Sequence, residues 1–419
     1  MSTPSIDLAQ HILLQFGIIL AVGSASAVFA QKLRVPDVVV FLFIGTLLGP
    51  EMLGLLDIKV DSTLNQVLLI FGSCYILFDG GASLRLPVLK EVWITILSLA
   101  TFGVLITAAV TAVAAFYFLG IPWIQALLLA TAIASTDPAT LVPVFRQVRI
   151  RDRVAQTVMS ESALNDATGA ILTFAVLGVA MGQGQFSLSE SLLGLLHQSF
   201  FGLVAGLLLG YLASTLIAHE TFGFLKDYSP VVSLMAVIGA YLSASGLHAS
   251  GFMAVFVFGF MVGNKDAFGF AMKEGEQQKL DDFVTTTALI MRMFIFFLLG
   301  SQVDFGLITQ YLIGGVGVVV VFMLVARPLT VFLCALPDRR ARWSLKELLF
   351  MCWTRETGVI PGALAGLLLG IGAPGAKLIA SVTFIAILMT ILIQATTTRW
   401  LASRLGLLED SLPLPLPQG

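Results

Sequence analysis

The stretch Ser160-Glu161-Ser162-Ala163-Leu164-Asn165-Asp166 decides the fold, because it places two carboxylates inside a long hydrophobic segment. A second acidic interruption, Ser135-Thr136-Asp137-Pro138, precedes it by the length of one helix. A carboxylate at bilayer depth is costly unless it is paired, protonated or facing water. Asp137, Glu161 and Asp166 fall within thirty residues of one another, which predicts a buried site where a cation and a proton compete.

The composition around this stretch is that of an integral membrane protein. The chain is 58% hydrophobic and 11% charged, with a mean hydropathy of +0.96, whereas a soluble domain carries roughly a quarter charged residues. Apolar runs of about 20 residues recur from end to end, which predicts an all-α protein that spans the lipid bilayer rather than a β-barrel. The net charge of −2 gives no reason to expect a nucleic-acid partner.

The sequence gives little support for a disulfide-stabilised protein, a metal site or a cleaved signal peptide. The three cysteines imply no disulfide framework, and the four histidines, at positions 11, 197, 219 and 248, are too dispersed for a metal motif. No cofactor is expected. Residues 1–10 contain no Lys or Arg, so the first apolar run is interpreted as a span and not as a cleaved signal peptide.

The apolar runs predict thirteen transmembrane helices. They fall at approximately 9–30, 35–50, 62–82, 89–119, 121–145, 154–182, 190–218, 229–246, 248–264, 280–300, 307–335, 345–371 and 375–402. With this count, eighteen Lys and Arg residues lie on one side, and only Lys59 and Lys377 lie on the other. The positive-inside rule then puts the N-terminus outside and the C-terminus in the cytoplasm.

Thirteen spans divide into six, one and six, so the first and last six would form two inverted repeats. The fifth span of the first half is interrupted at 136–143 and the fifth of the second half at 355–362, each by Pro, Gly or both. Unwound helices at matching places in inverted halves indicate a transporter's binding site. Pro138 disfavours helix at Asp137, so the first half-helix should end near Asp137 and leave carbonyl groups around Ala134 available to a cation.

The helix after the first interruption should present one polar face. At about 100° per residue, Glu161, Ser162, Asn165 and Asp166 span an arc of about 140°. Oxygen ligands of this kind suit a hard monovalent cation. Arg327 and Arg355 lie in apolar surroundings, and an uncompensated arginine there is costly, so each should face a carboxylate. Glu161 is the candidate partner, which would leave Asp166 as the titrating group.

These motifs resemble the type 1 monovalent cation–proton antiporters, the sodium/proton exchangers. Thr136-Asp137-Pro138 is similar to that family's unwound-helix motif, and Glu161 to Asp166 is similar to its Asn-Asp ion-binding helix. Arg327 and Arg355 match as well, and the likeness covers about residues 10 to 400. The resemblance implies a homodimer of thirteen-helix protomers with crossed unwound helices, in the cell membrane of a prokaryote, with a role in pH homeostasis.

The resemblance also implies a site. A cation (Na⁺, or K⁺ or Li⁺) would be bound by Asp166, Ser162 and the Thr136 carbonyl, and more loosely by Asp137 and Glu161. Arg327 is the first choice as the partner of Glu161, and the Asn165-Asp166 pair is similar to that of members exchanging one cation for one proton. One departure is Glu356, where the family often has Gly after Arg; this carboxylate could pair with Arg355 or Arg327.

Residues 1–404 would form the transmembrane antiporter domain, with 9–82 and 190–264 on the dimer or scaffold side and 89–182 and 280–402 in the ion-transporting core. Residues 405–419 would be a short disordered cytoplasmic tail. The leading interpretation is an electroneutral Na⁺/H⁺ antiporter and not an enzyme. A K⁺/H⁺ antiporter is the alternative, and an ion channel or a membrane-embedded enzyme fits less well.

One further expectation concerns the seventh span, 190–218. It carries a small residue at every fourth position, Gly202, Gly206, Gly210 and Ser214, which permits close helix–helix approach. We expect this span to belong to the static, dimer-forming domain and to pack against the first span of its own chain or of the partner; ordinary packing within one chain is the alternative.

Overall fold

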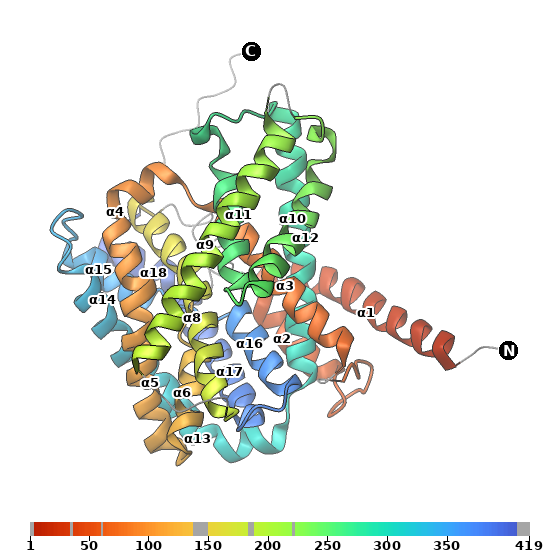
Figure 1. Ribbon diagram of the computed structural model, residues 1–419. Helices are drawn as coiled ribbons and strands as arrows, with labels where there is room; N and C mark the ends of the chain where they lie inside the picture. Colours follow the sequence, from red (N-terminus) through yellow and green to blue (C-terminus); the bar gives the residue numbers. More distant parts are fainter. Residues whose placement is uncertain are drawn as a thin grey trace.

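The computed structural model describes residues 4–33, 37–59, 62–136, 150–182, 188–219 and 223–408. The regular secondary structure of these residues is helical, apart from one isolated antiparallel bridge between Ile150 and Leu408 (Figure 1). The helices of the first half are α1 (Pro4–Leu33), α2 (Asp37–Leu48), α3 (Thr63–Ser83), α4 (Leu86–Ser98), α5 (Val104–Leu119), α6 (Trp123–Ala132) and α8 (Asp152–Ala180). Those that follow are α9 (Leu188–Ala218), α10 (Ser229–Gly246), α11 (Gly251–Gly263), α12 (Glu274–Ser301), α13 (Phe305–Val321), α14 (Arg327–Ala335), α15 (Leu345–Trp353), α16 (Val359–Gly370), α17 (Ala376–Met389) and α18 (Thr396–Leu405).

Three of the long rods contain a π-helical turn. They are η1 (Leu99–Gly103) between α4 and α5, η4 (Phe322–Ala326) between α13 and α14, and η5 (Thr390–Ala395) between α17 and α18. Counting each such rod once, nine helices within the described ranges are long and apolar enough to cross a membrane. Four shorter apolar helices, α2, α6, α11 and α16, accompany them. The all-helical transmembrane fold is thus confirmed, while the count of thirteen spans stays a prediction.

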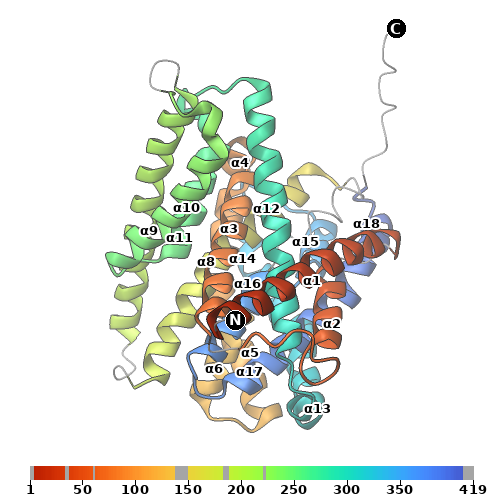
Figure 2. The same cartoon turned by 90° about the vertical axis from the view of Figure 1, so that its right-hand side faces the viewer.

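The helices pack in two neighbourhoods. Figure 2 shows α9, α10 and α11 together at one side of the molecule and α15 and α18 at the other. α11 packs against α3, α9 and α10, whereas α5, α6, α13 and α17 pack against one another around a separate apolar core. α12 lies along α2 and α3 and also contacts α16. The division into scaffold and core remains a prediction.

Glycine brings several helix backbones into direct contact. A Cβ atom at Gly81 of α3 would meet the carbonyl oxygen of Phe256 in α11, and one at Gly259 of α11 would meet that of Phe78 in α3. Likewise a Cβ at Gly45 of α2 would meet the Phe297 carbonyl of α12. In these pairs the absence of a side chain fixes how closely the helices approach.

The small residues of α9 face α11 of the same chain, so this stripe packs within one chain and not on the first span. A contact of α9 with a partner protomer stays a prediction. A Cβ at Gly206 would meet the carbonyl oxygen of Ala254 and, at 2.8 Å, the Cβ of Val257. A Cβ at Gly202 would meet the carbonyl of Ser250. The pattern correctly predicted close packing, but a stripe of small residues does not specify which helix fills it.

We therefore expect Gly206→Leu to act on folding. The added side chain has no room between α9 and α11, and overpacking of this kind costs about 1–3 kcal/mol or more. Gly239→Leu on α10 is the matched control, because a Cβ there meets nothing within 4 Å. Thermal unfolding in detergent should show a lower midpoint for Gly206→Leu only. Equal stability of the two variants would contradict the packing described.

Candidate functional site

The first interrupted helix ends earlier than expected. α6 begins after Pro122 and ends at Ala132, and residues 133–136 leave the helical path. The amide of Ile133 still donates to the Leu129 carbonyl, and that of Ala134 to the Thr131 carbonyl at 3.3 Å. Asp137 and Pro138, on which the prediction of the break rested, lie outside the described residues. The interruption itself is present before Thr136.

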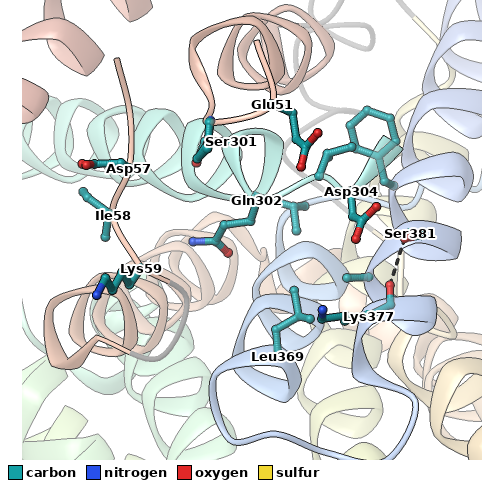
Figure 3. Close-up of a pocket in the computed structure, with 15 residues that line it drawn as sticks. Glu51, Asp57, Ile58, Lys59, Ser301, Gln302, Asp304, Leu369, Lys377 and Ser381 are labelled. Carbon is teal, nitrogen blue, oxygen red and sulfur yellow. Dashed lines mark hydrogen bonds between the residues drawn. The ribbon is translucent and has the colours of Figure 1, made fainter. Parts of the chain in front are cut away.

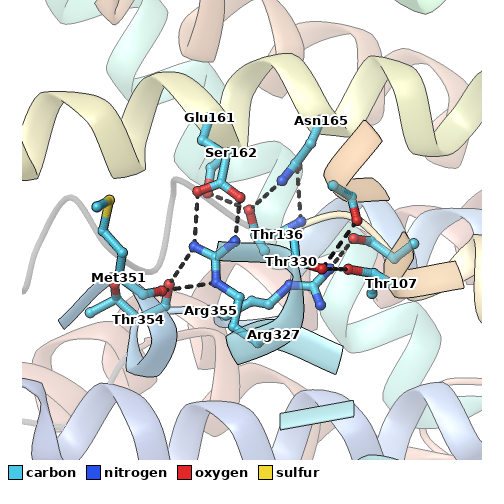
Figure 4. A network of polar contacts seen from close by, with 12 residues as sticks. Thr107, Thr136, Glu161, Ser162, Asn165, Arg327, Thr330, Met351, Thr354 and Arg355 are labelled. Atoms are coloured by element: carbon cyan, nitrogen blue, oxygen red, sulfur yellow. Dashed lines mark hydrogen bonds and ion pairs between the residues drawn. The ribbon is translucent and has the colours of Figure 1, made fainter. Parts of the chain in front are cut away.

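The polar face of α8 holds this unwound segment. The amide of Thr136 donates to Oδ1 of Asn165 at 3.0 Å, and Nδ2 of Asn165 donates to the Thr136 hydroxyl at 2.8 Å. The hydroxyls of Thr136 and Ser162 lie 2.5 Å apart. Figure 4 shows these groups meeting from two sides. The Asn165 side-chain oxygen thus takes the place of the main-chain acceptor that the Thr136 amide would have in a continuous helix.

Asp166 lies on the same face of α8. At about 100° per residue it falls within about 40° of Ser162 and about 60° of Gly169. A Cβ at Gly169 would come 3.1 Å from the Cβ of Ser135, so this face packs directly on the unwound segment. Asp166 exposes 2% of its surface.

Glu161 pairs with Arg327 of α14, as predicted. Nη2 of Arg327 donates to Oε2 of Glu161 at 2.9 Å, and Nη1 donates to Oε1, which makes the contact bidentate. Glu161 exposes 2% and Arg327 1%. Arg327 also donates from Nε to the carbonyl of Met351 at 2.9 Å and from Nη2 to that of Thr354 at 3.4 Å. One guanidinium therefore joins α8 to the end of α15.

The second interruption lies where it was expected. α15 starts with a capping box between Ser344 and Glu347 and ends at Trp353, and α16 begins at Val359. Arg355 lies between them, donates from Nη2 to the carbonyl of Ala134, and stacks 4.3 Å from the ring centre of Phe322. The two interruptions therefore meet.

This contact corrects the expected role of the Ala134 carbonyl. It accepts a hydrogen bond from Arg355, so a side-chain cation of the protein occupies it. Arg327 does the same at the end of α15, through the Met351 and Thr354 carbonyls. Each broken helix thus has an arginine at its carboxyl end, where the helix dipole favours positive charge.

Glu356 is fully buried beside these arginines, with 0% exposed. Its carboxylate interacts electrostatically with Arg327, whose hydrogen bonds go to Glu161 and two carbonyls. The next residue, Thr357, donates its amide to the hydroxyl of Thr390 in η5 at 3.1 Å. Glu356 therefore adds a third carboxylate to a centre that already contains Glu161 and Asp166.

Several contacts in this centre were not predicted. The Phe322 ring beneath Arg355, the Thr390 hydroxyl and the Met351 carbonyl carry no sequence motif. Arg292 of α12 lies 3.9 Å from the carboxylate of Asp37 in α2. At the irregular turn before Arg327, Pro328 was the one sequence indication, because proline has no amide hydrogen to donate to the preceding turn.

Two cavities lie toward opposite ends of the molecule. One, of about 740 Å³, is walled by α3, the segment after α11, α12 and the first turns of α8. The other, of about 320 Å³, is lined by Glu51, Asp57, Lys59, Asp304 and Lys377, as Figure 3 shows. On α8 the first cavity is lined by Asp152, Ala155, Gln156 and Met159, and Asp166 continues that line two turns further on.

A family model described as "Sodium/hydrogen exchanger, transmembrane" matches residues 17–404. The chain belongs to the sodium/hydrogen exchanger family. Within this family it is 33% identical over 360 residues to Na(+)/H(+) antiporter 1 of Methanocaldococcus jannaschii, an alignment that covers 83% of this chain and 81% of the relative.

A further antiporter and a solved antiporter structure are also similar. The K(+)/H(+) antiporter NhaP of Alkalimonas amylolytica is 29% identical over 402 residues, covering 93% of this chain and 66% of the relative. The solved structure of the sodium proton antiporter MjNhaP1 from Methanocaldococcus jannaschii at pH 8 superposes with a TM-score of 0.82 and 30% identity. That superposition covers 95% of this chain and 99% of the other.

Proposed function

We propose that this chain is a secondary active Na⁺/H⁺ antiporter in which Asp166 carries either the cation or the proton. The observation that carries the proposal is the position of this buried carboxylate, on the α8 face that holds the unwound segment at Thr136. A carboxylate held away from bulk water favours its neutral form unless a cation compensates it. Proton and cation then compete for the same oxygen atoms, and only one is carried at a time.

The proposed ligands are Asp166, Ser162 and the carbonyl of Thr136, with Asp137 as a looser ligand. Asn165 would act by fixing Thr136, to which it makes two hydrogen bonds. Glu161 would contribute charge rather than a direct ligand, because both of its carboxylate oxygens accept hydrogen bonds from Arg327. Arg327, Arg355 and Glu356 would set the remaining charge of the centre.

Alternating access would supply the coupling. The 740 Å³ cavity approaches Asp166 along α8 from one end of the molecule. Motion of the predicted core, 89–182 and 280–402, against the predicted scaffold, 9–82 and 190–264, would expose the site to each side in turn. With a single titrating carboxylate next to Asn165, we propose an electroneutral exchange that serves pH homeostasis.

We further propose the membrane context of this antiporter. The end carrying the basic loops would face the cytoplasm and the N-terminus would lie outside, following the excess of Lys and Arg. The protein would sit in a prokaryotic cell membrane as a homodimer. Supporting this, the relatives described above are prokaryotic antiporters.

Exchange of K⁺ for H⁺ is the second candidate, because relatives named K(+)/H(+) antiporters align over 93% of the chain. Na⁺ and K⁺ carry the same charge, so the size of the ligand cage around the ion and the flexibility of its ligands decide between them. Proteoliposome flux with Na⁺, Li⁺ and K⁺ in turn, followed with a pH dye, distinguishes the two. Flux that depends on membrane potential and not on a proton gradient would instead indicate a channel.

The competition predicts a specific pH dependence. Below the pKa of the site, the apparent cation affinity should fall about tenfold for each pH unit, because one proton competes with one cation. The measurement is the Michaelis constant for the cation between pH 5.5 and 9 on the same vesicles. A Michaelis constant that does not change over this range, with the maximal rate alone changing, would contradict competition at one carboxylate.

A further inference from the structure

We propose that Lys265 is a built-in positive charge that controls how strongly the large cavity attracts cations, and so sets the cation affinity from that side only. The inference rests on the proposed antiport and on three features of the cavity wall. They are the burial of Lys265, the neutral group that binds it, and the position of the cavity along α8.

Lys265 is buried in the wall of the large cavity, whereas lysine side chains are usually exposed to water. It follows α11 in the short helix η3 (Lys265–Phe268), lines the 740 Å³ cavity and exposes 3% of its surface. The preceding residue, Asn264, fixes this segment by accepting from the amide of Leu86 at 2.9 Å and donating to the carbonyl of Leu84 at 2.8 Å. The ammonium group is therefore held in a defined position.

The partner of the ammonium group is an amide. Nζ of Lys265 donates to Oε1 of Gln277, and Nε2 of Gln277 donates to Oδ1 of Asp281 at 2.7 Å. Among the described residues, no carboxylate lies within 4.0 Å of Lys265. A buried lysine is usually neutralised by direct pairing. Here the positive charge is separated from Asp281 by a neutral side chain, so its field reaches the cavity.

The rest of the cavity is acidic. Its charged lining groups are Asp79 of α3, Arg85 before α4, Asp152 of α8, Lys265 and Asp266 of η3, and Asp281 of α12. The four carboxylates and two cations leave a formal charge of −2, and removal of Lys265 makes it −3. Low-dielectric walls focus such a field and concentrate counter-ions. Lys265 therefore reduces the local cation concentration below what the carboxylates alone would produce.

The cavity leads toward the proposed ion site. Met159 lines it, and Asp166 lies seven residues further along α8, about 10 Å away and within about 20° of the same direction. A change in the potential of the cavity is thus felt by a cation on its way to Asp166. The smaller cavity at the other end shares none of these residues.

The charge on Lys265 also depends on pH. Burial lowers the pKa of the Lys265 ammonium and Arg85 lowers it further, while Asp266 and Asp281 oppose the shift. Lys265 consequently loses its charge at a lower pH than an exposed lysine. As the pH on that side rises, the cavity becomes more attractive to cations.

The experiment compares the cation Michaelis constant from each side in everted and right-side-out membrane vesicles. Lys265→Met should lower the constant about three- to fivefold from the cavity side and leave the opposite side unchanged. Lys265→Arg, which keeps the charge, should match the wild type. Lys265→Gln retains a donor for Gln277 and serves if the Met variant does not accumulate. Asp281→Asn, which removes a negative charge from the same wall, should raise the constant.

Two further readouts separate a field effect from a packing effect. The change in Lys265→Met should shrink in high concentrations of an inert salt, and it should shrink as the pH on the cavity side is raised. Lys279→Gln is the matched control, since Lys279 is exposed on α12 and donates to the Asp227 carbonyl.

The outcomes are distinguishable. Equal Michaelis constants for Lys265→Met and wild type, or shifts in the same direction for Lys265→Met and Asp281→Asn, would overturn the role of Lys265. A wild-type protein without cation-dependent proton flux would overturn the proposed antiport instead.

Discussion

Asp166→Asn is expected to reduce cation-dependent proton flux to the background of protein-free vesicles. Asparagine has nearly the same shape as aspartate but neither titrates nor offers a charged oxygen pair, so both exchanged ions lose their carrier. The carboxylate lies on the α8 face packed against the unwound segment and is 2% exposed, so no solvent-exposed group can replace it. Fold and yield should be retained, because the substitution removes a buried charge rather than a side-chain volume.

The matched control is Asp282→Asn, an exposed aspartate on α12 that lines neither cavity. It should leave exchange unchanged. Size-exclusion profiles and thermal unfolding of both variants confirm that the comparison concerns folded protein. Proton flux that still depends on the cation in Asp166→Asn would refute the assignment of the carrier.

The second large effect is expected at the ion pair of Glu161 with Arg327. Removing one partner of a buried pair strands the other charge, at a cost of about 3–5 kcal/mol. Arg327→Gln should cost more than Glu161→Gln, because Arg327 also satisfies the carbonyl groups of Met351 and Thr354. The double variant should be more stable than the sum of the two single losses predicts.

A double-mutant cycle in thermal stability measures this coupling. Arg292 and Asp37 provide the comparison within the same chain, since they lie 3.9 Å apart and are partly exposed, with 16% and 20% of their side chains accessible. Their coupling should be much smaller. Strictly additive losses at Glu161 and Arg327 would show that the pair contributes no joint stabilisation.

The sequence predicted those features that depend on local chemistry. The break after Trp353 follows from Arg355, Glu356 and Gly358 within an apolar run, and the polar face of α8 follows from the spacing of Ser162, Asn165 and Asp166. Glu161 was a candidate partner because a buried guanidinium requires a carboxylate, whereas the choice of Arg327 over Arg355 came from the family resemblance. Burying a polar or charged group in a membrane costs free energy unless the group has a partner. The composition and spacing of the sequence show where such groups occur and therefore where partners are required.

Features that depend on which surfaces meet were not predictable in the same way. The small residues of α9 could have served several helices, and only the tertiary arrangement assigns them to α11. The contact of Arg355 with the Ala134 carbonyl joins positions 221 residues apart, and the Phe322 ring beneath it has no distinguishing motif. The early end of α6 has the same origin, because Asn165 accepts a hydrogen bond from the amide of a non-helical Thr136 and donates one to its hydroxyl.

The glycine contacts described above determine where the molecule can deform. Between α3 and α11, which both belong to the predicted scaffold, main-chain atoms touch directly at Gly81 and Gly259, so no side-chain rotamer at these contacts can absorb a displacement. We therefore expect this helix pair to move as one rigid unit. Relative motion of helices should therefore occur at interfaces filled by flexible side chains. The wall that α8 shares with the large cavity is one such interface.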